Sequence, residues 1–418
     1  MNQLSTEVLE QVFRKLREEY HTSRYEFSAS LVNRRWCRII IPIMWEDPFG
    51  STNFPDRLVK IFLSILDDES RLLLNNNEVD LSKSPSFQAT FDYAYFIRSL
   101  QLDRMYDGIR NYLFADDIGY NQLYKGEEQI KKYKKIGCIF RVISSLILRR
   151  SGRIEHIRPI YPYGLDYAAL EDDINLIPYL TNANKCLKYL RVVMTFGGDY
   201  TKFYLGLLTI CKNLITIITS ITTLESANAL ATLIRAQNSL EDLSVFFTEE
   251  YFLESVLESL SSQKESLISL TLNTCSFNTI SDDALKSFVS CKKLERLVLE
   301  RCIGLEKERF ISLSRSFPML KEVIFYYKHY IGYFPDNFIV GLIETANVNL
   351  RKLDFNFYSS IVVNAILNYI PEFDLCRFGF DYEFKSYKEL KESEFHRFID
   401  GSGDYSNVEE ESSEAEDD

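Results

Sequence analysis

The side chains with the most obvious catalytic or metal-binding chemistry in this sequence are four histidines. A zinc site needs several such ligands close together, and a nucleophile–base pair needs a histidine within hydrogen-bond reach of a hydroxyl or thiol. The histidines lie far apart along the chain and in unrelated segments, at His21, His156, His329 and His396. We therefore predict no catalytic residues, no bound metal and no enzymatic activity of the chain itself.

The cysteines are spaced as repeat positions and not as ligands. Cys275 and Cys302 each lie eight residues after the first leucine of an L-x-x-L-x-L segment, and Cys211 and Cys291 each lie three residues before one. The paired C-x-x-C spacing of zinc sites does not occur in the sequence. We predict buried, reduced thiols that pack as small apolar groups, in preference to a metal site or a disulfide network.

Two other stretches raise the question of a phosphate or nucleic-acid ligand. Gly197-Gly198 lacks the Lys-Ser/Thr or the third glycine of phosphate-binding loops, so we interpret it as a turn. The run from Lys125 to Lys135 is basic, but Glu127 and Glu128 interrupt it and no nucleic-acid-binding motif accompanies it. We predict neither a cofactor nor a nucleic-acid partner.

Beyond residue 180 the sequence repeats an L-x-x-L-x-L-like core. Successive cores begin 25 to 30 residues apart, close to the period of about 20 to 29 residues found in leucine-rich repeats. The first residues of these cores are Leu187, Leu214, Leu240, Leu267, Leu294, Leu320, Leu350 and Leu375. Two earlier segments, IRSLQL from Ile97 and IEHIRPI from Ile154, resemble divergent cores.

Each core predicts a short strand, and the segment between cores predicts a helix, as in Ser281 to Ser290. One strand–helix repeat cannot bury both of its faces alone, so neighbouring repeats should stack. The predicted fold class is α/β, a solenoid with a parallel sheet inside and helices outside. We expect it to span residues 90–399, with clear repeats from 187, a polar insertion from Tyr106 to Lys135, and a last helix from Tyr387 to Ile399.

The first 48 residues predict a separate helical module, joined to the repeats by a linker or helical connection over residues 49–89. Apolar residues recur at helical spacing from Leu4 to Leu16, and Ser5 or Thr6 can cap the start of that helix. A second apolar helical face is expected between Ser30 and Trp45, which Pro42 should end or kink. A few short helices bury little apolar surface by themselves. We therefore expect a partner to cover the apolar surface that remains exposed.

This module resembles the F-box. The resemblance is carried by Leu4, Glu7, Val8, Leu9, Val12, Phe13 and Leu16, then by Leu31 to Trp36, and finally by Met44 and Trp45. Ser5 stands where the family usually has proline. The resemblance implies docking onto the Skp adaptor of a cullin–RING ubiquitin ligase. The implied adaptor-binding residues are Leu4, Val8, Leu9, Val12, Phe13, Leu31, Val32 and Trp36. The alternative is an ordinary helical cap on the repeats.

The cysteine-bearing repeats resemble the cysteine-containing subclass of leucine-rich repeats, which is common in proteins that begin with an F-box. Together the two resemblances imply a substrate receptor that holds the adaptor and cullin at one end and an unidentified protein substrate at the other. Ubiquitin transfer would then be accelerated by proximity and not by groups of this chain. The alternative is a non-catalytic repeat scaffold without ubiquitination.

The two-residue period of the strands predicts which side chains face the substrate. The fourth and sixth residues of each core face inward, so the third, fifth and seventh face the concave surface. The candidate substrate-binding residues are Tyr189, Arg191, Phe246, Arg296, Glu300, Tyr326, Lys352 and Arg377. Loops at the strand ends are an alternative site.

Composition agrees with an intracellular protein in the cytoplasm, the nucleus or both. The 418 residues are 46% hydrophobic and 26% charged, with a net charge of −12. No run reaches the length of a membrane span, and the first residues lack a signal-peptide profile, so no membrane partner is expected. Residues 400–418 contain nine acidic residues and no Lys or Arg, which predicts a disordered, solubilising tail. Phosphorylation of its serines is the alternative role.

Overall fold

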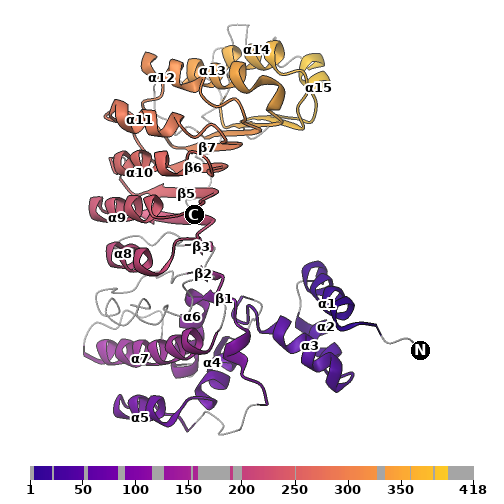
Figure 1. Cartoon of the computed structure of the whole chain (residues 1–418), viewed down its shortest axis with the longest axis vertical. Helices are drawn as coiled ribbons and strands as arrows, with labels where there is room; N and C mark the ends of the chain where they lie inside the picture. The colour runs from indigo at the N-terminus through magenta and orange to yellow at the C-terminus, as the bar shows by residue number, and fades with distance from the viewer. Residues whose placement is uncertain are drawn as a thin grey trace, which may run out of the picture. The chain divides into compact units, whose positions relative to one another are not determined.

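The computed structural model (Figure 1) forms two compact units, Met1–Leu240 and Glu241–Asp418. The described residues are 4–20, 23–50, 55–82, 90–114, 127–151, 154–158, 189–191, 200–249, 251–326, 335–357, 359–379 and 382–393. Three of the histidines, Gly197-Gly198 and the acidic tail fall outside these ranges. Across the described ranges, no helix has both the length and the apolar character needed to cross a bilayer.

The first unit begins with a module of three helices around a small core. Leu9 and Phe13 from the first helix meet Ile40 and Ile43 from the third, and all four are buried. Trp36 packs on the edge of this core, with its ring 5.2 Å from that of Phe13 in an edge-to-face arrangement. The helices are α1 (Thr6–Tyr20), α2 (Ser23–Ser30) and α3 (Arg34–Met44).

Side-chain caps decide where two of these helices begin. The Ser5 hydroxyl accepts the N–H of Val8 at 3.3 Å, which confirms Ser5 as the cap of α1. The prediction of a helix starting at Ser30 was wrong, because the Asn33 side chain accepts the Trp36 N–H at 2.9 Å and sets the start of α3 at Arg34. Leu31 and Val32 therefore lie in the turn before α3. Pro42 lies inside α3 and does not end it.

Helices also form the connection after this module. Gly108 allows two of them, α4 and α6, to approach closely, since a side chain there would meet the backbone of Pro55. The predicted polar insertion from Tyr106 to Lys135 was wrong for its described part, because Tyr106, Ile109 and Tyr133 are buried. The helices are α4 (Pro55–Ser64), α5 (Asp68–Asn76), η1 (Tyr93–Phe96), α6 (Leu102–Phe114) and α7 (Glu127–Arg150).

Four parallel strands complete the first unit. Ser99, His156, Tyr189 and Thr216 are paired across them, and each is the third residue of its predicted core. This register confirms that the segments from Ile97 and Ile154 are early members of the series. The elements are β1 (Ser99–Gln101), β2 (His156–Arg158), β3 (Tyr189–Arg191), α8 (Thr201–Ile210), β4 (Thr216–Ile221) and α9 (Leu224–Arg235).

The second unit continues the alternation of strand and helix. Its strands lie in chain order, and every pairing is parallel except that of the last two. Helices α10 and α11 lie on one side of β5 to β7 (Figure 1). The strands are β5 (Asp242–Phe247), β6 (Ser269–Asn273), β7 (Arg296–Glu300), β8 (Glu322–Tyr326), β9 (Lys352–Phe355), β10 (Leu375–Phe378) and β11 (Tyr382–Phe384).

The helices of the second unit follow their strands in the order the sequence predicts. The predicted helix from Ser281 begins with a serine cap, since the Ser281 hydroxyl accepts the Ala284 N–H at 3.2 Å. The helices are α10 (Leu253–Ser259), η4 (Leu260–Gln263), α11 (Asp282–Val289), α12 (Glu308–Ser314), α13 (Asp336–Ala346), η5 (Asn347–Asn349), α14 (Ser360–Tyr369) and α15 (Tyr387–Glu392). The helix predicted to run to Ile399 instead ends at Glu392, because Ser393 has an extended backbone; residues 394–399 lie outside the described residues.

One backbone contact recurs from repeat to repeat. The carbonyl of the second core residue accepts two N–H groups, those of the second and third residues of the next core. Glu241 accepts from Ile268 and Ser269 at 2.8 and 2.9 Å, and Ile268 accepts from Glu295 and Arg296 at 2.8 and 3.0 Å. Glu295, Lys321 and Arg351 repeat the contact, as does Arg98 in the first unit.

This contact corrects the frame of the last core. Leu375 pairs with Lys352, which is a third residue, and the carbonyl of Arg351 accepts from Asp374 and Leu375. The core therefore begins at Phe373, which is buried as the leading leucines are, and not at Leu375. Because the start moves by two residues, every side chain of this strand keeps its predicted direction, inward or outward. Arg377 becomes the fifth residue of its core instead of the third.

The cysteines at repeat positions are buried in both units, Cys211 in the first and Cys275, Cys291 and Cys302 in the second. Cys275 and Cys302 are buried and free, with their sulfur atoms 3.2 Å apart on adjacent repeats. Burial raises the pKa of the Cys291 thiol to about 11 and also raises the pKa of Cys376. Among the described residues no three His, Cys, Asp or Glu side chains are grouped as metal ligands would be.

Cys291 should resist alkylation in the folded protein. The thiolate is the nucleophile, and a pKa of about 11 leaves this buried thiol almost fully protonated at pH 8. Iodoacetamide at pH 8 should modify Cys37, which is half-buried, well before Cys291. Peptide mass spectrometry of the native protein measures both rates. Equal rates for the two cysteines would contradict the burial of Cys291.

Candidate functional sites

The three-helix module exposes several apolar side chains on α1, just before it and on the turn before α3, here together called the apolar face. It contains five of the predicted adaptor-binding residues, which are between 42% and 70% exposed. Soluble proteins expose scattered apolar side chains, but a concentration of them on one small module is typical of a binding surface. These five residues are Leu4, Val8, Val12, Leu31 and Val32.

The other predicted adaptor-binding residues lie beneath or beside this face. Leu9 and Phe13 are buried in the module core, because they occupy the side of α1 that faces α3. Trp36 is half-buried against them. Val8 and Val12 lie on α1 next to the buried Leu9 and Phe13 but outside the module core. The apolar surface of α1 is therefore larger than the part of it that the core buries.

Two further exposed aromatic residues belong to the same module and were missed in the sequence. Tyr25 and Phe27 on α2 are 52% and 58% exposed. The apolar periodicity of α1 drew attention away from α2, whose apolar residues are few and follow no strong helical pattern. An aromatic residue followed closely by the Leu31-Val32 pair is the signal that could have found them.

Arginine contacts hold the edge of the apolar face. The Arg35 guanidinium donates to the carbonyl oxygen of Leu4 at 2.6 Å and lies 3.4 Å from the Thr6 hydroxyl. These contacts attach the residues before α1 to α3. They fix Leu4 next to the start of the helix.

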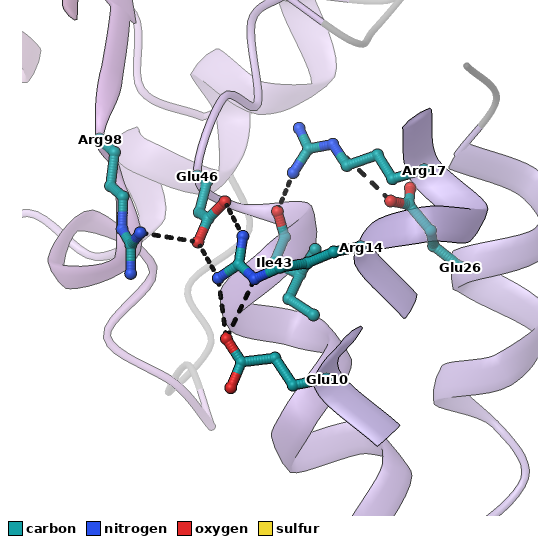
Figure 2. Close-up of polar contacts among 7 residues, drawn as sticks. All are labelled: Glu10, Arg14, Arg17, Glu26, Ile43, Glu46 and Arg98. Carbon is teal, nitrogen blue, oxygen red and sulfur yellow. Dashed lines mark hydrogen bonds and ion pairs between the residues drawn. The ribbon is translucent and has the colours of Figure 1, made fainter. Parts of the chain in front are cut away.

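A polar cluster lies elsewhere on α1 (Figure 2). The Glu46 carboxylate accepts two hydrogen bonds from Arg14, at 2.9 and 2.8 Å, and forms an ion pair with Arg98 at 3.3 Å. Arg14 also pairs with Glu10 within α1, at 2.9 Å. These carboxylates, Glu46 first, raise the pKa of Arg14.

Arg17 and Glu26 form a second polar pair inside the module (Figure 2). Arg17 donates to the carbonyl of Ile43, and its Nε lies 3.7 Å from the Glu26 carboxylate. Glu26 is buried, and burial raises the pKa of its carboxyl group while Arg17 opposes the shift. Arg17 thus connects α1 with α2 and α3.

The second candidate site lies on the sheet of the second unit. It is the face on which the third, fifth and seventh core residues lie, predicted above as the concave surface and here called the outer face of the sheet. The third and seventh core residues of its strands are half-buried, as the predicted alternation requires. The fifth core residues of β5 to β9 were predicted to face the same surface, but they are covered there and only 2% to 8% exposed. These covered residues are Ser244, Thr271, Val298, Ile324 and Asp354.

Ion pairs between neighbouring strands connect the candidate substrate-binding residues. Glu322 pairs with Arg296 on one side at 3.2 Å and with Lys352 on the other at 2.8 Å. Glu300 accepts a hydrogen bond from Asn273. Cross-strand pairs of this kind set the orientation of long side chains, which then lie over the middle row of the face.

Asp354 is at the centre of a further cluster on this face. It accepts from the Tyr326 hydroxyl at 3.0 Å and pairs with Arg377 at 3.3 Å. Arg377 also pairs with Glu383 on β11. Burial, and next the Asp354 charge, raises the pKa of Tyr326. Glu383 lay outside the predicted set, because only the reversed direction of β11 brings it next to Arg377.

The other predicted substrate-binding residues lie on β5 and β3. Phe246 is a half-buried seventh residue on β5. Tyr189 and Arg191 lie in β3 of the first unit, and their side chains are outside what the structure describes. The structure therefore groups Arg296, Glu322 and Lys352, and groups Tyr326 with Arg377.

A cavity of about 410 Å³ between α5 and α7 was not predicted. Leu72, Leu73 and Val142 contribute apolar surface, and Arg141 and Arg149 contribute charge. Its residues come from two helices that the sequence did not pair, so no pattern along the chain indicated it.

Comparison with known proteins adds no identification. No protein-family model matches the sequence, and no curated protein matches it.

The buried carboxyl group of Glu26 should make the module sensitive to pH. Its folded-state pKa lies above the unfolded value of 4.5, so the stability that protonated Glu26 supports is lost as pH rises through the folded pKa. Glu26→Gln should therefore raise the unfolding temperature more at pH 7 than at pH 4. Tryptophan fluorescence reports this, because Trp36 and Trp45 are the two tryptophans. A lower unfolding temperature for Glu26→Gln at pH 7 would show that the Arg17 pair outweighs burial.

Proposed function

We propose that this chain is the substrate-recognition subunit of a Skp–cullin–F-box ubiquitin ligase. In this proposal the apolar face of α1 to α3 binds the Skp adaptor, and the repeats bind a protein substrate. The chain supplies no catalytic group, and it acts by holding the substrate near a charged conjugating enzyme.

The apolar face carries the proposal. Burial of one large apolar side chain contributes about 1.5 to 3 kcal/mol, and the module leaves Leu4, Val8, Val12, Leu31 and Val32 exposed. A module of this size could cover some of them with its own helices, but α1 and the turn before α3 direct them outward. A protein partner of matching apolar surface accounts for this arrangement.

The repeats are proposed to form a leucine-rich-repeat solenoid. The recurrent second-residue carbonyl contact and the chain-ordered parallel strands support this reading. The substrate would contact the outer face of the sheet, where aromatic and arginine side chains such as Tyr326 and Arg296 are found, as they often are in protein-binding hot spots.

The alternative is a repeat scaffold in which the three helices only cap the stack. The contact of the Glu46 carbonyl with the start of β1 favours it, since a cap must bind the end of the sheet. A cap, however, has no need of an exposed apolar face on its far helices. The two functions are separated by whether the adaptor and cullin co-purify with the chain.

Charged substitutions on the apolar face should weaken adaptor binding. Val12→Asp with Val32→Asp removes two apolar contacts and places carboxylates in the interface, so affinity should fall at least about tenfold. Leu224→Asp is the matched control, because Leu224 is 53% exposed on α9. Calorimetric titration with purified adaptor measures the affinities. Unchanged binding by the double variant, with the control also unchanged, would exclude the apolar face.

Substitutions on the outer face of the sheet should change the captured substrates and leave the adaptor bound. Arg296→Ala with Tyr326→Ala removes two half-buried side chains whose loss leaves the strand core intact. Arg315→Ala is the control, since Arg315 directly follows α12 and its side chain is 64% exposed. Quantitative mass spectrometry of proteins co-purified under proteasome inhibition makes the comparison. If every candidate substrate persists, loops at the strand ends are the binding site.

A further inference from the structure

The segment that follows α3 contacts the sheet in the same way as a repeat does. The carbonyl of Glu46 accepts the N–H groups of Arg98 and Ser99, both at 2.9 Å. Arg98 and Ser99 are the second and third residues of the first core. Their contact with Glu46 is therefore the recurrent contact of the repeats, with Glu46 in the place of a second core residue.

The neighbours of Glu46 fit the same frame. Trp45 occupies the place of the leading leucine and is buried, with its ring stacked on Tyr93 at 4.1 Å and edge-to-face with Phe62 at 5.9 Å. Pro48 occupies the place of the buried fourth residue and is buried as well. The Asp47 carboxylate accepts from the Gln101 side chain of β1 at 2.8 Å.

The Glu46 side chain then connects this segment to α1. Its carboxylate is 17% exposed and lies between Arg14 of α1 and Arg98 at the start of β1 (Figure 2). Partly buried, charge-assisted hydrogen bonds of this kind are stronger than surface ion pairs and are screened less by salt. Two arginines from different elements are thus held by one carboxylate.

We propose that residues 45–48 are the first, reduced repeat of the sheet and that Glu46 is the positioning residue that fixes α1 relative to β1. The backbone contact continues the sheet into the module, and the carboxylate sets the direction of α1. The edge of the sheet is covered by the same segment, as terminal repeats must be. If the proposed function holds, the apolar face is held in a fixed orientation at this end of the sheet.

A distance measurement tests this inference directly. Spin labels on bio-orthogonal amino acids at Lys15 on α1 and Asn111 on α6, both exposed, report the placement of α1 in the full chain by pulsed electron paramagnetic resonance. The wild-type chain should give one narrow distance. Glu46→Gln should widen it, because the charged link between Arg14 and Arg98 is lost while the backbone contact of residue 46 and the packing of α1 on α3 remain.

Two further variants make the result decisive. Glu10→Gln removes the other carboxylate partner of Arg14 without touching β1, so it should keep the narrow distance. Arg98→Gln removes the cation on the β1 side and should broaden the distance as Glu46→Gln does, which guards against a folding defect peculiar to one variant. A narrow distance in both Glu46→Gln and Arg98→Gln, or a broad one in wild type, would overturn the proposal. Adaptor titration of the same variants is a separate readout: no binding by wild type would refute the proposed function and leave the distance result standing.

Discussion

The structure depends on one recurrent backbone contact, in which the carbonyl of a second core residue accepts two N–H groups from the next core, as it does for Arg98 in the first unit and for five consecutive cores of the second. This contact fixes the register of neighbouring strands, and in this register the leading leucines of the second unit, Leu267, Leu294, Leu320 and Leu350, are all buried. A single slip would place leucines outside and charged residues inside. The contact tolerates varied side chains, since Glu241, Ile268, Glu295, Lys321 and Arg351 all provide the carbonyl.

The strand register also explains why the two candidate sites differ in chemical character. Strands held in register bring Glu322 between Arg296 and Lys352, so the outer face is a set of mutually paired charges over a covered middle row. The three-helix module instead presents an apolar surface, because its small core buries only part of the apolar side chains. A polar, pre-ordered face suits recognition of a particular surface, and an exposed apolar face suits docking on a matching one.

Much of the fold could be predicted because the leucine period is long and regular. The strands beyond Leu187 were predicted from this period, the segments from Ile97 and Ile154 from their likeness to a core, and the cap at Ser5 from its residue type and position. The start of α3 could not be predicted from apolar spacing. Leu31 and Val32 continue the helical spacing, although the Asn33 cap places them before the helix. The frame of the last core was missed because Phe373 replaces a leucine.

The sites were predicted less completely for a physical reason. Alternation along a strand says which way a side chain points, but its exposure depends on long neighbours that lie across it, as Arg377 does with Asp354. Contacts such as that of Glu46 with Arg14 and Arg98 join residues far apart in the chain, so no local pattern indicates them.

In the proposed function, the apolar face of α1 to α3 binds the Skp adaptor while the repeats stay free for another protein. Hydrogen–deuterium exchange of the full chain with and without purified adaptor tests it most directly. Adaptor binding to the apolar face should slow exchange in α1 and in the turn at Leu31 and Val32 and leave β5 to β11 unchanged. Slower exchange confined to the sheet, or no change in the three helices at saturating adaptor, would contradict it.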